Sequence, residues 1–437
     1  MSKHDAEQIF LAGVESVLPD KMMRKVFYLE KDTLHISNLS FQLADFQNIY
    51  VIGAGKASAL MAKEIETVLG NRITKGHIIV KHGHGCTLEH ILVTEAGHPT
   101  PDEPGFRATS EIVQLMHQVG EDDLVLCLIS GGGSSLLTDY PEGSSPEDLI
   151  LLNQLLLKSG ADIQEMNSVR KHVSHIKGGQ LARIIFPATL VSLILSDVIG
   201  DSLDVIASGP TSPDTATFGD ALQILKKYNL TERIPSSILR HLTLGSQGLI
   251  AETPKTGDPA FRKTDNLIIG SNLIALQAAS QKAIALGYNV SIVTSELNGD
   301  AALAAEQIVQ NAILIQNDPS RPNPFCLLYG GETTVQVTGT GLGGRNQHLA
   351  LCAAFLLEIT EGITLLSAGT DGNDGPTDVA GAVVDGSTLQ DVNTLKIDPR
   401  DYRNRFDSYH FFQQAGGHIR TGSTLTNVMD LIVVLIK

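Results

Sequence analysis

The sequence predicts an α/β protein of two domains. Its 437 residues exceed what one hydrophobic core usually holds. Apolar, strand-like runs alternate with helical segments, which is the order typical of parallel α/β folds. Several of these runs break abruptly into glycine-rich loops, and the clearest break is from Leu124–Ile129 into Ser130–Ser135. Because ligands of open α/β sheets bind just beyond the strand ends, this loop is the first candidate binding element.

The loop after Ile129 has the composition of an anion cradle. Three consecutive glycines let the backbone turn sharply and let an anion approach its N–H groups, and the flanking serines offer hydroxyl donors. An ordinary tight turn explains the same residues equally well. The remaining motifs must decide between these two interpretations.

Composition narrows the class of protein. Hydrophobic residues make up 42% of the chain and charged residues 18%, as in globular proteins. A net charge of −16 argues against a nucleic-acid partner and against a membrane surface. The first residues have no apolar signal core, and no apolar run approaches the ~20 residues of a membrane span. Without a C-x-x-C pair, the four cysteines are expected to be reduced in a cytoplasmic protein.

The first half begins with a helix near 5–17 and continues with a strand at 48–52. This strand ends in Gly53-Ala54-Gly55-Lys56-Ala57-Ser58, and a helix follows as far as Leu69. Ser58 stands where the dinucleotide fingerprint needs a third glycine, so the evidence for a nicotinamide cofactor is weak. Lys56 lies at the first helical turn, where it opposes the positive helix end. An anionic ligand would explain this placement, and a solvated lysine is the alternative.

Two short strands, 77–80 and 91–94, are followed by loops that contain several histidines. The spacing of these histidines matches no standard zinc site, so they are expected to border a ligand cleft. Helices are predicted at 145–159, around 167–172 and after 180. The strand 188–195 runs into Asp197, a favoured catalytic position in α/β folds, although a turn or helix-capping aspartate is the alternative.

A stretch rich in Gly, Pro, Lys and Thr between about 245 and 263 predicts the connection between domains. We therefore expect an N-terminal domain over 1–245, a connection over 246–265 and a C-terminal domain over 266–437. The second series has predicted strands at 267–269, 289–294, 325–329, up to 338 and at 363–367, with helices at 273–286, 301–314 and after 344.

Two loops of the second half carry candidate site residues. Glu332 follows a strand, and Arg345 lies where a glycine-rich turn opens a helix. The loop 371–378 is acidic but does not fit an EF-hand. Asp371 and Asp374 are candidates for binding a divalent cation, and an Asx-turn role is the alternative.

Together these parts suit phosphoryl transfer, which needs N–H groups and cations around phosphates and carboxylates for magnesium or the attacking hydroxyl. The Walker lysine motif, the protein-kinase H-R-D set and the G-x-S-x-G motif of serine hydrolases are all absent.

Nine motifs in order resemble those of the type-2 glycerate kinases, the glycerate 2-kinase family with a C-terminal MOFRL domain, whose members are sometimes labelled hydroxypyruvate reductase. The motifs are GAGKAS, GHG, EAGHPTPDEPG, ISGGGSSLL, NSVRKHVSHIKGGQLA, LSDVIGDSLDVIASGPT, ETPKTGDPAF, GGETTVQVTGTGLGGRNQ and SAGTDGNDGPTDVAGAVVD. The resemblance implies a Rossmann-like N-terminal domain with a mostly parallel sheet, a smaller MOFRL-type α/β domain and an active-site cleft between them. It further implies transfer of phosphate from ATP to D-glycerate, giving 2-phosphoglycerate, with Mg²⁺ or another divalent cation. A homodimer is possible.

The resemblance and the residue-level reasoning select one set of candidates. Lys56 and Arg345 match the family's functional lysine and arginine, and Asp197 is our candidate for orienting the hydroxyl or binding the metal, with Asp374 as a second metal ligand. The nucleotide- and substrate-binding candidates are Ser130, Gly131, Gly132, Gly133, Ser134, Ser135, Asn167, Arg170, Lys177, Glu332 and Asp371.

The sequence departs from the family pattern at His348, where Glu is common, and around Ser423, where a proline and a glycine are replaced. His348 is expected to face either the cleft or the core. Two rival functions remain open. One is an NAD(P)H-dependent hydroxypyruvate reductase, and the other is a catalytically silent ligand-binding relative.

Overall fold

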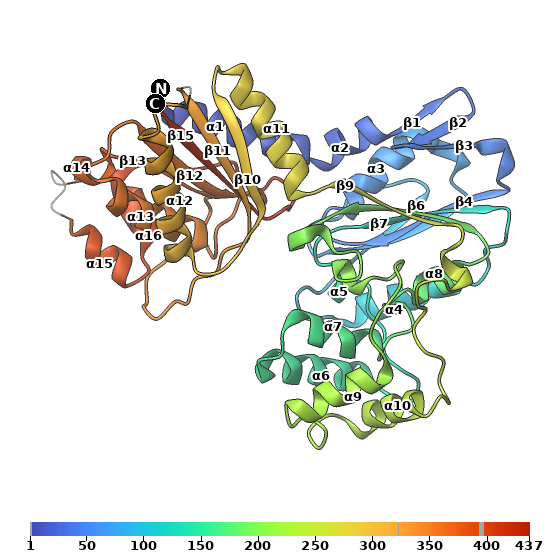
Figure 1. The fold of residues 1–437 in the computed structure, drawn as a ribbon. Coiled ribbons are helices and arrows are strands. Elements are labelled where there is room, and N and C mark those ends of the chain that lie inside the picture. Colours follow the sequence, from blue (N-terminus) through green and yellow to red (C-terminus); the bar gives the residue numbers. More distant parts are fainter. Residues whose placement is uncertain (1, 322, 393–396) are drawn as a thin grey trace. The chain divides into compact units, whose positions relative to one another are not determined.

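The chain folds into two compact units, each with its own six-stranded sheet (Figure 1). The computed structural model describes residues 2–321, 323–392 and 397–437. The N-terminal unit comprises Met22–Ser196 and Asp201–Ile269, and the C-terminal unit comprises Met1–Lys21, Asp197–Gly200 and Gly270–Lys437. In the described part of the chain, no helix is long and apolar enough to cross a lipid bilayer.

The elements of the N-terminal unit are β1 Phe27–Glu30, β2 Thr33–Ile36, β3 Leu39–Gln42, β4 Asn48–Ala54, α3 Ser58–Leu69, β5 Lys75–Lys81, β6 Ile91–Ala96, α4 Glu103–Met116, β7 Asp123–Ile129, α5 Gly133–Leu136, α6 Pro146–Ser159, α7 Ile163–Lys171, α8 Gln180–Ile185, β8 Thr189–Leu195, α9 Phe218–Lys227, α10 Ser236–Ser246 and β9 Thr264–Gly270. Helix α2, Pro19–Val26, crosses the boundary between the units in the chain. Short 3₁₀ turns span Leu43–Asp45, Gly70–Arg72, Ile199–Asp201, Ile206–Ser208 and Pro259–Phe261.

The N-terminal sheet has the order β6-β5-β4-β7-β8-β9. Strands β4, β5, β6, β7 and β8 pair in parallel with their neighbours. In chain order this is 3-2-1-4-5-6, the doubly wound arrangement in which the strand order reverses between the first and fourth strands. The reversal lies between β4 and β7, whose last residues Ala54 and Ile129 pair with each other. The two glycine-rich loops that follow β4 and β7 therefore leave the sheet side by side at its topological switch point.

Burial explains why the central strands are continuous apolar runs. All seven residues of β7 are buried, as expected for a parallel strand covered on both faces. The helices around the sheet carry ordinary start signals. In α6, Ser145 and Asp148 form a reciprocal capping box and Pro146 occupies the first turn.

The elements of the C-terminal unit are α1 Ser2–Ser16, α11 Asn272–Ala285, β10 Asn289–Leu297, α12 Ala301–Gln316, β11 Phe325–Gly331, α13 Arg345–Leu357, β12 Ile363–Gly369, β13 Gly381–Asp385, α14 Thr388–Val392, α15 Pro399–Asn404, α16 Ser408–Ala415, β14 His418–Ile419 and β15 Asp430–Ile436. The sheet order is β10-β11-β15-β12-β13-β14. Only β10 and β11 pair in parallel, and the other pairs are antiparallel.

The last strand of the chain, β15, is the centre of this second sheet. It is fully buried and lies between β11 and β12. Its alternate residues Ile432, Val434 and Ile436 pack with α12 and α13, while Leu431 reaches α1 at Gly13. Helices α1 and α11 pack against each other and against the sheet, and so do α12 and α13, which places the two pairs on opposite faces (Figure 1).

The predicted α/β class, with a mostly parallel N-terminal sheet, is confirmed, and three local predictions differ from the structure. Residues 27–42, which the sequence left irregular, form the antiparallel meander β1-β2-β3. The strand predicted up to 338 is absent, since residues 332–338 contain only an isolated bridge from Thr334 to Asp300. The segment 267–269, predicted to open the second domain, instead completes the first sheet as part of β9.

The compact units also divide the chain differently from the expected boundaries. Residues 1–21 belong to the C-terminal unit, because α1 packs on α11 and on β12, β13 and β15. The stretch 246–265 lies within the N-terminal unit, because it leads into the edge strand β9 of that sheet.

Candidate functional site

The switch point of the N-terminal sheet joins the two glycine loops through direct hydrogen bonds. Ser130 Oγ accepts from the Ala57 amide at 3.0 Å, and the Lys56 amide donates to the Gly131 carbonyl at 2.9 Å. Gly55 has φ +143°, and a Cβ atom there would collide with Ser130. Only glycine therefore lets the loops approach this closely. Ser58, at the third-glycine position, is buried and its hydroxyl lies 3.2 Å from Ser130 Oγ.

The turn after β7 offers unpaired amide groups next to the backbone of Lys56. In the described residues, the N–H groups of Gly131 and Gly132 donate to no acceptor, and the Lys56 ammonium has neither a hydrogen bond nor an ion pair. A Cβ atom at Gly132 would come within 2.8 Å of the His98 ring. The pKa of His98 is lowered to about 4, mainly by burial and to a smaller extent by the charges of Lys56 and Lys81. Its ring is therefore neutral at pH 7. Open N–H groups with an unpaired ammonium are the chemistry of an anion site.

The hydroxyl groups of the loop serines form hydrogen bonds that stabilise the turn. Ser134 Oγ lies 2.8 Å from Ser208 Oγ, and the Ser208 hydroxyl donates to Asn167 Oδ1 at 3.2 Å. Ser135 Oγ donates to the Gly132 carbonyl. Hydroxyl donors for the anion were expected here, but the Ser134 and Ser135 hydroxyl groups form hydrogen bonds within the protein.

The Lys177 side chain stabilises the same turn. Its ammonium is buried and donates to the carbonyl oxygens of Ser134 and Leu137, at 2.6 and 2.7 Å. Burial lowers the pKa of Lys177 to about 8, and nearby Arg170 acts in the same direction. Arg170 itself donates through Nε to Asn153 Oδ1 at 2.9 Å. Lys177 is therefore a positioning residue for the turn.

A second set of candidate residues lies in the C-terminal unit, at the end of the sheet where β11 and β12 end and β15 begins. Gly331 of β11 and Gly369 of β12 both pair with Asp430, the first residue of β15. Arg345 opens α13 above this edge. Its guanidinium binds Asp430 through Nε at 2.6 Å and Nη2 at 3.0 Å, and Glu332 through Nη1 at 2.7 Å. The bidentate pair fixes the plane of the guanidinium.

Asp197 and Asp371 belong to this same cluster. Burial raises the pKa of Glu332, Arg345 opposes that shift, and Asp430, Asp197 and Asp371 raise the pKa further. The structure thus brings together four of the predicted residues: Arg345, Glu332, Asp197 and Asp371. Asp371 Oδ1 also accepts from the Asn373 amide, which is the Asx turn that the sequence left as an alternative.

Asp374 has a different role from the predicted metal ligand. Its side chain is buried, and its two oxygens accept from the amides of Asn346 and Gln347 at 3.0 and 2.8 Å and from both of their side chains. These donors saturate the carboxylate and anchor the start of α13 next to Arg345. In the described residues, no group of three His, Cys, Asp or Glu side chains has the geometry of a metal site.

Known proteins match this chain along nearly its whole length. Residues 5–243 match a domain of unknown function, DUF4147, and residues 325–430 match the MOFRL family. A D-glycerate 2-kinase from Thermotoga maritima is 42% identical over 436 residues, covering 99% of this chain and 97% of the relative. The chain belongs to the glycerate 2-kinase family. A glycerate 2-kinase from Pyrococcus horikoshii is 39% identical, covering 97% of this chain and 95% of the relative.

The fold of the glycerate 2-kinase family is shared as well. A crystal structure of glycerate kinase from Thermotoga maritima superposes on this chain with a TM-score of 0.89 at 40% identity. The alignment covers 100% of this chain and 99% of that one. The family assignment made from the nine motifs is confirmed.

For this glycerate 2-kinase family member, sequence reasoning missed three residues of the two clusters. Asp430 begins an apolar strand near the C-terminus, and an acidic residue directly before such a strand was the available signal. His98 was seen only as one loop histidine among several. Ser208 has φ +60°, which no sequence pattern reveals.

Asp374 gives this glycerate 2-kinase family member a measurable pH dependence. Burial raises the pKa of Asp374 from 3.8 to about 6. Between these values the folded protein binds more protons than the unfolded chain, so raising the pH from about 4 to about 6 lowers the free energy of unfolding. Asp374→Asn removes this titration. We expect the wild-type stability, relative to the variant, to fall across this interval and then to level off.

Urea unfolding at several pH values measures this difference. The loss of hydrogen bonds to the new amide lowers the stability of Asp374→Asn by an amount that does not depend on pH, so only the slope is diagnostic. Parallel curves for the two proteins between pH 4 and 6 would contradict the assignment.

Proposed function

We propose that this protein transfers the γ-phosphoryl group of ATP to the 2-hydroxyl of D-glycerate. The proposal rests on the open amides of Gly131 and Gly132 at the switch point together with the unpaired ammonium of Lys56, whose backbone binds this turn. Doubly wound sheets bind nucleotides at this place, and phosphates are held by N–H groups and cations. The names of the relatives supply the acceptor, since the curated proteins matched at 42% and 39% identity are glycerate 2-kinases.

Lys56 and the turn after β7 act on the phosphates in this proposal. The amide groups of Gly131 and Gly132 donate to phosphate oxygens, and the Lys56 ammonium neutralises charge on the transferring group. His98 stays neutral and limits the space above Gly132. Asn167 acts on the turn through Ser208, Lys177 acts on it directly, and Arg170 binds Asn153 of α6.

The residues of the C-terminal unit are proposed to act on glycerate. Asp430 and Glu332 take three of the five guanidinium N–H donors of Arg345. The remaining donors can bind the glycerate carboxylate. Asp197 is the group that we propose for orienting the 2-hydroxyl.

We propose that ATP binds together with a divalent cation, most simply Mg²⁺. Asp197 and Asp371 lie close enough to Glu332 to raise its pKa. One or two of these carboxylates, together with the substrate phosphates, would hold Mg²⁺, which prefers hard oxygen donors. When bound, the ion would neutralise phosphate oxygens. A cytoplasmic location and a homodimer remain predictions.

One assay tests the function. The purified protein is incubated with D-glycerate, ATP and MgCl₂, and 2- and 3-phosphoglycerate are resolved by NMR, with L-glycerate as the control substrate. We expect 2-phosphoglycerate from D-glycerate only. Absence of ATP consumption, together with NADH oxidation on hydroxypyruvate, would replace the kinase with the reductase.

Lys177→Met tests how the turn is positioned. The variant removes two hydrogen bonds from an ammonium to loop carbonyls but keeps the length of the side chain. We expect the KM for ATP to rise about tenfold, because each hydrogen bond to a charged group contributes roughly 1.5–3 kcal/mol and part of that energy orders the turn. Steady-state kinetics with ATP varied measure the change. An equal rise in the KM for glycerate would contradict a role confined to the phosphate turn.

A further inference from the structure

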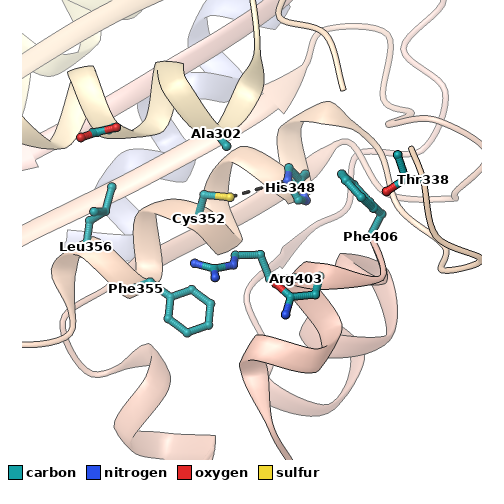
Figure 2. A pocket seen from close by; sticks show the side chains of 10 residues that line it. Ala302, Thr338, His348, Cys352, Phe355, Leu356, Arg403 and Phe406 are labelled. Atoms are coloured by element: carbon teal, nitrogen blue, oxygen red, sulfur yellow. Dashed lines mark hydrogen bonds between the residues drawn. The ribbon is translucent and has the colours of Figure 1, made fainter. Parts of the chain in front are cut away.

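A cavity of about 530 Å³ lies on the outer side of α13, beside residues that the proposed reaction does not use (Figure 2). It is lined from three directions by α12, α13 and the segment around α15. The lining residues are Ala302, Glu306, Thr338, His348, Cys352, Phe355, Leu356, Arg403, Asn404 and Phe406. Its volume is within the range of small-molecule pockets. We call it the Arg403 pocket.

His348 lines this pocket, and one of its two ring nitrogens has no hydrogen-bond partner. The residue is only 7% exposed, and its Nδ1 is buried without a hydrogen-bond partner. The other nitrogen, Nε2, lies 3.7 Å from Cys352 Sγ, one helical turn further along α13. The imidazole also stacks on Phe406, with ring centroids 4.9 Å apart, which fixes its orientation. A buried polar atom without a partner calls for a ligand that supplies one.

The protonation states decide which kind of partner Nδ1 needs. Burial raises the pKa of Cys352 to about 11, so the thiol keeps its proton at pH 7, and burial lowers the pKa of His348, so the imidazole is neutral. A thiol is a weak donor and a still weaker acceptor, whereas imidazole nitrogen accepts well. The Cys352 thiol therefore donates to Nε2, and Nδ1 carries the ring proton. The missing partner is a hydrogen-bond acceptor.

Arg403 supplies a cation to the same space. Its guanidinium lies over the Phe355 ring, 4.6 Å from the centroid, and in the described residues it has no hydrogen bond or ion pair. Arg405, two residues on, is paired with both Asp401 and Asp407. Glu306 is the one carboxylate in the lining, and it is exposed to solvent and accepts from Gln310. Its charge is therefore screened more than that of a buried group.

We propose that the Arg403 pocket binds a small organic anion, a carboxylate or a phosphate ester, between the Arg403 guanidinium and the Nδ1–H group of His348. The aromatic rings of Phe355 and Phe406 contact its apolar part. The site is separate from the residues proposed for phosphoryl transfer, and its test does not depend on kinase activity.

Alkylation of Cys352 provides a chemical test of anion binding in the pocket. Iodoacetate and iodoacetamide alkylate thiols by the same displacement: Sγ bonds to the CH₂ carbon, iodide leaves with the C–I electron pair, and the thiol proton passes to His348 Nε2. The two reagents differ in that only iodoacetate carries a carboxylate. If Arg403 and His348 bind anions, iodoacetate docks before it reacts.

The measurement is the ratio of the alkylation rates with iodoacetate and iodoacetamide, determined at each cysteine by peptide mass spectrometry. We expect the ratio at Cys352 to exceed that at the half-buried Cys86 by about tenfold, because a charge-assisted hydrogen bond holds the reagent. Arg403→Gln should abolish the excess. Arg400→Gln, which removes an exposed guanidinium from the same helix, should leave it unchanged. An equal ratio at both cysteines, or an excess that survives in Arg403→Gln, would overturn the proposal.

Two anions then distinguish the ligand classes. Pyruvate and inorganic phosphate are each tested for protection of Cys352 against iodoacetamide. Protection by either one supports the site, and the more effective anion identifies the class. If Cys352 reacts with neither reagent, the same anions are titrated against the ¹⁵N ring signals of His348, assigned with His348→Asn. Absence of any saturable shift there refutes anion binding.

Discussion

Lys56→Ala is expected to lower kcat by about 10²–10³-fold, the usual cost of removing one preorganised charge-stabilising group from an active site. The reason is specific to its surroundings. Lys56 has no counter-ion in the described residues, and its backbone is held by the Gly131 carbonyl, so that the side chain is free to meet an anion. Because no protein partner loses a bond, the free energy of unfolding should change little.

Steady-state kinetics and urea unfolding check both parts of this prediction. Lys63→Ala is the matched control, since Lys63 lies exposed on α3, the helix that Lys56 precedes, and its loss should leave turnover near the wild-type value. Near-normal turnover of Lys56→Ala would remove Lys56 from the mechanism.

Arg345→Met is expected to affect both stability and activity. The Asp430 side chain is 4% exposed, and Arg345 is its ion-pair partner. Removing one partner of a buried pair leaves an uncompensated charge, which costs about 3–5 kcal/mol of folding free energy. Glycerate phosphorylation should fall by at least about 10²-fold, since the proposed carboxylate donors are lost.

A double variant separates these two effects. Arg345→Met with Asp430→Asn removes both charges, so much of the lost stability should return in urea unfolding. Activity should not return, because the guanidinium is still missing. Recovery of turnover in the double variant would mean that Arg345 acts only by neutralising Asp430.

The N-terminal half was predicted well because its signals are local. The six consecutive apolar residues Leu124–Ile129 made β7 recognisable in the sequence, and the glycine loops after β4 and β7 marked the ends of their strands. Lys56 stood out as a cation at a helix start. What the sequence could not supply was the order of the strands, and with it the direct contact between Ala57 and Ser130. That contact joins residues 73 positions apart.

The C-terminal half was predicted less completely because its sheet depends on distant pairing. Arg345 was identified from its glycine-rich turn, but its partner Asp430 lies 85 residues away on a strand that no prediction included. Asp374 looked like a metal ligand because acidic loops resemble one another. Its bonds to the start of α13 follow from tertiary packing, which composition does not record.

The central place of β15 has a consequence for how the protein is made. Of the strands of this sheet, β15 is synthesised last, yet it must insert between β11 and β12, which are synthesised at least sixty residues earlier. Until then Arg345 lacks Asp430, and α1, which is synthesised before every strand of this sheet, lacks the complete sheet that it covers. The C-terminal unit can therefore complete its sheet only after β15 has been synthesised, whereas every strand of the N-terminal sheet is available much earlier. A chain that ends before Asp430 would retain an intact phosphate turn and lose the partner of its arginine.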